Sequence, residues 1–66
     1  MNGLIIMKKT LEQKLMHIPG VVGVGADLDR RLILVYVESE SVIPKVMPLT
    51  QGYPVEFKVV GRVSVA

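Results

Sequence analysis

The stretch IPGVVGVGADLDRRLILVYVESE, residues 18–40, decides the fold of this chain. It holds two runs rich in valine, isoleucine and leucine, at residues 21–27 and 32–37, with a charged segment between them. β-Branched residues favour strands, and aspartate favours turns because its side chain hydrogen-bonds to nearby backbone. The stretch therefore predicts a β-hairpin whose strands are joined by a turn at residues 27–31.

The second of these predicted strands is apolar on both faces. Successive side chains of a strand point to opposite faces, so Leu32, Leu34 and Tyr36 share one face, and the other face carries isoleucine and valine. A strand of this kind is typical of the centre of a sheet that is covered on both sides. We therefore expect residues 32–37 to form the central strand.

Glycines mark the first predicted strand. Gly23 and Gly25 share one face, and glycine weakens a strand unless another part of the chain approaches closely. A helix packed on the sheet or a β-bulge would explain them. A dinucleotide-binding loop has its glycines between a strand and a following helix, whereas these precede a strand. The glycine cluster therefore does not predict a phosphate site.

A helix is predicted over about residues 7–18. Its apolar positions lie on one stripe with a period near 3.6 residues: Met7, Leu11, Leu15 and Ile18. Pro19 disfavours helical geometry at the residue before it, so the helix must end there. Residues 1–6 are predicted to be a short paired strand or a frayed extension, and Met7 is an alternative first residue of the protein. We prefer the strand because the run GLII is too apolar to be left in water.

The last third of the chain predicts little helix and one further strand. Pro44 and Pro48 leave room for at most a single helical turn between them. Apolar and charged residues alternate over residues 55–59, which predicts a half-buried strand. After an interruption at Gly61, the strand is predicted to continue over residues 63–65.

Together these elements predict a single α+β domain over residues 1–66. A chain of 66 residues is too short to enclose two cores. The predicted architecture is a compact ferredoxin-like sandwich, with one main helix on a mostly antiparallel sheet of about four strands. Residues 4–7 would supply the first strand. One helix covers one face of such a sheet, so we expect the other face to be open.

The composition excludes several kinds of site. The chain has no cysteine and a single histidine, so we expect no disulfide, no transition metal and no cofactor. Its formal charge of +2 comes from scattered basic residues, and so small an excess indicates little about the partners of the protein. No apolar run approaches the ~20 residues of a membrane span. We expect a cytoplasmic protein without a membrane partner.

No group of residues predicts catalysis, so the chain is not expected to be an enzyme. His17 lies at the end of the predicted helix, and no motif places a nucleophile or an orienting group beside it. A histidine at that position is interpreted as an exposed side chain favoured by the helix dipole. Asp27 and Asp29 are too few ligands for a calcium loop and are interpreted as turn residues.

The segment LEQKLMHIPGVVGVGADLDRRLILVYVE, residues 11–38, resembles the helix and hairpin of heavy-metal-associated domains. In that family the helix ends at a Gly-Val corner before two antiparallel strands, as at Gly20 and Val21 here. The resemblance implies a ferredoxin-like fold. The metal loop of the family is a Cys-x-x-Cys before the helix, and this chain has no cysteine, so metal carriage does not transfer.

A second resemblance runs from residue 18 to residue 63. The pieces IPGVVGVG, VYVES, IPKVMP and GYPVEFKVVGRV are similar to a small module ahead of some bacterial and plant trypsin-like peptidase domains. Those modules read GVVGVG, an apolar strand, an IPK turn and PVEVVEVG. The peptidase domain itself is missing here. The resemblance implies a stand-alone accessory module with no catalytic residue to carry over.

The predicted function is a non-enzymatic protein-interaction or self-assembly module. Folding buries too little surface in a chain of this size, so we expect a homo-oligomer that associates through the sheet, or an unidentified protein partner. The candidate interface residues are Leu32, Leu34, Tyr36 and Phe57.

The alternative function is nucleic-acid binding through the sheet face and the hairpin. Arg30 and Arg31 would contact phosphate at the hairpin turn. Sheet-based RNA readers carry a Lys/Arg-Gly-aromatic run on a central strand, and LILVYVE lacks one. The discriminating observation is salt-sensitive binding of an oligonucleotide.

Overall fold

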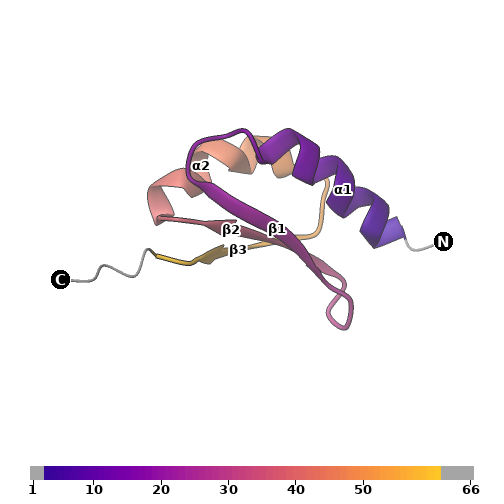
Figure 1. Ribbon diagram of the computed structural model, residues 1–66. Helices are drawn as coiled ribbons and strands as arrows, with labels where there is room; N and C mark the ends of the chain where they lie inside the picture. Colours follow the sequence, from indigo (N-terminus) through magenta and orange to yellow (C-terminus); the bar gives the residue numbers. More distant parts are fainter. Residues whose placement is uncertain (1–2, 62–66) are drawn as a thin grey trace.

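The computed structural model describes residues 3–61, which form a layer of helices on one side of a β-sheet (Figure 1). The elements in chain order are helix α1 (Gly3–Leu15), strands β1 (Val21–Asp27) and β2 (Leu32–Val37), the short helical pieces η1 (Glu40–Val42), α2 (Ile43–Val46) and η2 (Met47–Thr50), and strand β3 (Val55–Val59). The predicted continuation at residues 63–65 lies outside the described residues.

The sheet formed by these residues has three strands in the order β1-β2-β3. Strand β1 pairs with β2 in an antiparallel hairpin, and β3 pairs with β2 in parallel. The predicted hairpin and the central place of β2 are confirmed. The ferredoxin-like prediction is confirmed only as an α+β fold, because residues 3–61 give three strands and a mixed sheet. Strand β3 can run parallel to β2 because a long helical connection separates them.

The predicted first strand is wrong, because residues 3–6 belong to helix α1. Leu4 lies seven residues before Leu11, on the apolar stripe of the helix, and both side chains are buried. The apolar run at the start of the chain therefore extends the helix and leaves the sheet without a fourth strand.

Helix α1 also ends earlier than predicted, at Leu15. The Ile18 N–H then bonds to the Leu15 carbonyl at 2.9 Å, and the Val21 N–H bonds to the Ile18 carbonyl at 3.1 Å. The first bond tightens the end of the helix before Pro19, and the second closes a turn around Pro19 and Gly20. Gly20 completes the corner with a φ of 95°, in the left-handed region that favours glycine.

The two prolines divide the connection between β2 and β3 into short helical pieces. The four residues of α2 are the single helical turn that the sequence predicts here, but the pieces η1 and η2 on either side of it were not predicted. Pro44 lies in the first turn of α2, and Pro48 lies in the first turn of η2. Proline is tolerated there because the first N–H groups of a helix have no partner within it. The prolines thus restart the helix.

The hydrophobic core lies between the helices and one face of the sheet. Its buried side chains come from α1, β1, β2 and the connection: Leu4, Leu11, Leu15, Val24, Ile33, Val35, Val37, Val42 and Val46. Both α1 and α2 lie on the same side of the sheet in Figure 1. The helical connection therefore packs on the same face of the sheet as α1. No described helix covers the opposite face of the sheet.

Candidate interaction surface

We call the face of the sheet opposite the helices the open face. It consists of the strand residues that alternate with those pointing into the core: Gly23, Gly25, Asp27, Leu32, Leu34, Tyr36, Glu56 and Lys58. Cross-strand pairing arranges six of these residues in two rows. One row is Gly23, Tyr36 and Lys58, and the other is Gly25, Leu34 and Glu56. Three of the predicted interface residues, Leu32, Leu34 and Tyr36, therefore lie together.

Phe57, the fourth predicted interface residue, lies on the other side of the sheet. It pairs with the buried Val35 and packs against the core. Because side chains alternate along a strand, its neighbours Glu56 and Lys58 face the open side instead. The alternation of β3 is visible in the sequence, but its register against β2 is not. Sequence reasoning therefore included Phe57 and missed Glu56 and Lys58.

The ring of Tyr36 lies along the backbone of β1. A Cβ placed on Gly25 would be 3.4 Å from the ring carbon Cε2, and one on Gly23 would be 3.9 Å from Cδ2. The glycines thus accommodate an aromatic side chain from the neighbouring strand, on the face away from the helices. A bulge between Val21 and Gly23, which the sequence also predicted as an explanation, is present as well. This contact leaves Tyr36 half-buried.

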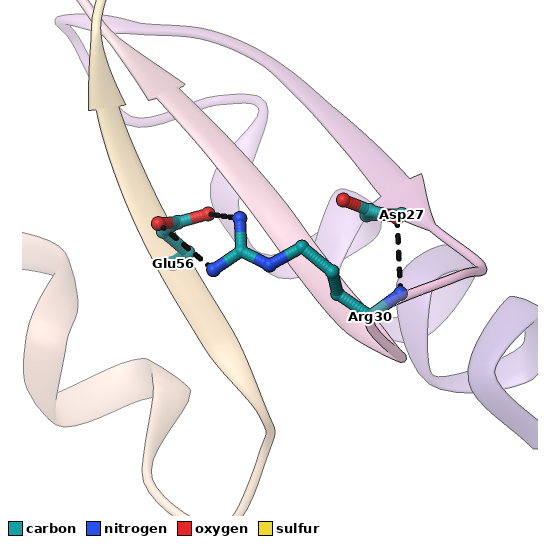
Figure 2. A network of polar contacts seen from close by, with 3 residues as sticks. All are labelled: Asp27, Arg30 and Glu56. Carbon is teal, nitrogen blue, oxygen red and sulfur yellow. Dashed lines mark hydrogen bonds and ion pairs between the residues drawn. The ribbon is translucent and has the colours of Figure 1, made fainter.

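An ion pair links the hairpin turn to strand β3 across the sheet. Figure 2 shows the Arg30 side chain extending past β2 toward Glu56. The guanidinium donates from Nη1 to Oε2 at 3.0 Å and from Nη2 to Oε1 at 3.4 Å. The Arg30 backbone N–H also donates to Asp27 Oδ1 at 3.1 Å, which fixes the turn. Both partners are solvent-accessible, so the pair adds at most about 1 kcal/mol to stability.

The hairpin arginines predicted to contact phosphate differ in their surroundings. Arg30 is already ion-paired with Glu56. Arg31 is exposed and has a φ of 56°, a conformation that non-glycine residues rarely adopt. One hairpin arginine is therefore ion-paired and the other is exposed to solvent. Nucleic-acid binding stays a prediction.

Other chemistry-bearing side chains are dispersed. His17 is exposed after the end of α1. Within residues 3–61 there is no group of three or more His, Cys, Asp or Glu side chains that could hold a metal ion. In the same part of the chain, no helix is long and apolar enough to cross a membrane. The open face is therefore the feature to which a function can be attached.

The chain matches no protein-family model, and no curated protein or solved structure matches it significantly. The resemblances to heavy-metal-associated domains and to the module ahead of trypsin-like peptidases stay predictions.

Proposed function

We propose that the protein is a non-enzymatic self-assembly module that forms a homodimer by packing two open faces together. One observation carries the proposal. The described helices all lie on one side of the sheet, and the central strand presents Leu32, Leu34 and Tyr36 on the other. A strip of large apolar side chains on a central strand is a surface that association would remove from water.

The size of the chain supports a second copy as the partner. A chain of 66 residues buries only roughly 60% of its unfolded surface, so its core is small. A two-fold dimer uses the same patch on both subunits, which suits a face with one apolar strip along its middle. Packing two such faces together would form a further apolar layer between the two sheets, and no second kind of protein would be needed.

The dimensions of the open face imply a weak dimer. Three strands spaced about 4.8 Å apart, with about 3.3 Å per residue along each, give on the order of 300 Å² in projection. A standard interface buries about 800 Å² on each partner. The intramolecular contacts of Tyr36 further reduce what is left to bury. We therefore expect a dissociation constant in the micromolar range or weaker.

The test is the mass in solution as a function of concentration. Sedimentation equilibrium from ~10 µM to ~1 mM spans the affinity expected of a small interface. The average mass should rise from 7.3 kDa toward twice that value. A monomer throughout this range would end the proposal.

A pair of matched variants locates the surface. Leu34→Lys puts a charge on the open face and should give folded, soluble monomers, because a charge buried without a partner is costly. Leu49→Lys is the control, since Leu49 is 43% exposed on η2, away from the sheet. The control should associate as the wild type does. Equal loss of association in both variants would contradict the assignment of the open face.

A further inference from the structure

We infer that the two copies pack with their strands antiparallel, so that Lys58 of each copy lies against Glu56 of the other and Tyr36 lies against Leu34. This inference rests on the homodimer proposed above. It is carried by the order of charges and side-chain sizes on the open face.

The open face carries one charge of each sign on strand β3. Glu56 belongs to the row of Leu34, and Lys58 belongs to the row of Tyr36. The two rows are two residues apart, or about 6.6 Å along the strands. Lys58 is exposed and makes no ion pair within residues 3–61, whereas Glu56 has Arg30 on one side. The face therefore holds a basic group that association could pair.

Two-fold symmetry restricts how these charges meet. If the two-fold axis runs along the strands, each row faces the same row of the partner, and β3 faces β1 of the partner. Lys58 then lies against Gly23, and no charges pair. With the axis across the strands and between the two rows, β3 faces β3 and the rows exchange. Each Lys58 then meets a Glu56, and symmetry makes this contact twice.

Other positions of the same axis are unfavourable. An axis centred on the Tyr36 row brings the two Lys58 side chains together. An axis centred on the Leu34 row instead brings together two Glu56 carboxylates that are each ion-paired with Arg30 of the same copy, and it leaves Lys58 without an opposite charge. Like charges in contact oppose association. Charge therefore opposes the first of these registers, and exchange of the rows is the arrangement that gives each Lys58 an opposite charge.

Side-chain size selects the same arrangement. Facing layers interdigitate best where large and small residues oppose each other. Exchange of the rows places the Tyr36 ring against Leu34 at two symmetric positions. With the axis along the strands, the two tyrosines would meet each other and the two leucines would meet each other, which leaves a gap beside a crowded contact.

The test is a charge exchange between two variants. Lys58→Glu places a glutamate against the partner's Glu56, and Glu56→Lys places a lysine against the partner's Lys58. Each variant alone should self-associate at least about tenfold more weakly than the wild type, because two attractions become two repulsions. An equimolar mixture should form a heterodimer of nearly wild-type affinity, because both contacts again join opposite charges.

Controls separate this effect from net charge and from misfolding. Glu40→Lys and Lys45→Glu make the same exchange on exposed residues of the helical connection, and each should still self-associate as the wild type does. Circular dichroism checks that Glu56→Lys remains folded without its pair to Arg30. Lys58→Glu breaks no described contact and is the cleaner variant.

The outcomes distinguish this inference from the proposal on which it rests. If the wild type dimerises and Lys58→Glu dimerises equally well, the antiparallel arrangement is wrong and self-assembly stands. Weakened variants whose mixture is not restored would also overturn the arrangement. A wild type that stays monomeric removes both.

Discussion

At the scale of single residues, Gly20 determines how the helix passes into the sheet. Its φ of 95° lies in the left-handed region, and a Cβ there would overlap a γ carbon of Val42. The backbone is also held in place, because the Glu38 N–H donates to the Gly20 carbonyl at 2.9 Å. The corner between α1 and β1 is therefore packed against the segment that follows β2.

Gly20→Ala should be strongly destabilising, and Gly52→Ala should separate its two causes. Gly52 has a φ of 87°, but a Cβ there would meet nothing within 4 Å. Gly52→Ala should therefore cost only the left-handed strain, about 1–2 kcal/mol. Gly20→Ala should cost a further 1–3 kcal/mol, approximately, because it also overpacks Val42. Urea unfolding measures both, and equal losses would mean that the Val42 contact relaxes freely.

Arg31 is the converse case, because it carries a side chain at a positive φ that glycine would adopt with less strain. Arg31→Gly should raise stability by about 0.5–1 kcal/mol, because glycine adopts a positive φ without a Cβ penalty. Arg31→Ala is the matched control, since it removes the same charge and keeps the Cβ. Thermal unfolding should show a gain of a few degrees for the glycine variant alone. A gain in both variants would assign the effect to charge.

The residue scale also separates what the sequence could predict from what it could not. The Pro19-Gly20 corner and the Asp27 turn were predictable because each depends on the local chemistry of one or two side chains. The approach of Val42 to Gly20 was not, since it joins positions far apart in the chain. The same holds for Gly23 and Gly25, which indicated a close neighbour but not that the neighbour is Tyr36.

At the scale of elements, the main ambiguity was the apolar run at residues 3–6. Short apolar runs fit a strand or a helix equally well, because they span too little of either period. The run extends α1 because Leu4 continues the stripe of Leu11 and Leu15. In the connection at residues 40–50 the single turn α2 was predicted, but η1 and η2 beside it were missed, since a proline at the start of a helix and one that breaks it look alike in sequence.

The start of α1 can be tested with two neighbouring side chains. Leu4 is 9% exposed and Ile6 is 52% exposed, although both lie in the first turns of the helix. Leu4→Ala should cost about 2 kcal/mol or more, as for a buried leucine. Ile6→Ala should change stability by less than about 0.5 kcal/mol, as for a surface site. Equal effects in chemical denaturation would mean that residues 3–6 do not pack as a helix.

At the scale of the whole molecule, the two sides of the sheet have different roles. The covered side takes every described helix and almost all of the buried side chains. The strand order could not be read from the sequence, because pairing of β3 with β2 depends on contacts between distant segments. The sequence predicted an open face but left open which one. That choice depended on where the helical connection lies.

The difference between the two sides predicts how stability depends on concentration. Only association couples the melting temperature to protein concentration, because folded chains bind each other and unfolded chains do not. The wild type should therefore melt several degrees higher after a roughly hundredfold increase in concentration above its dissociation constant. Leu34→Lys, on the open face, should melt at one temperature at every concentration. Val35→Lys, one residue along the same strand and fully buried, should not fold at all, because its charge would enter the core. Scanning calorimetry measures all three, and a wild-type melting temperature that is independent of concentration would contradict the proposed dimer.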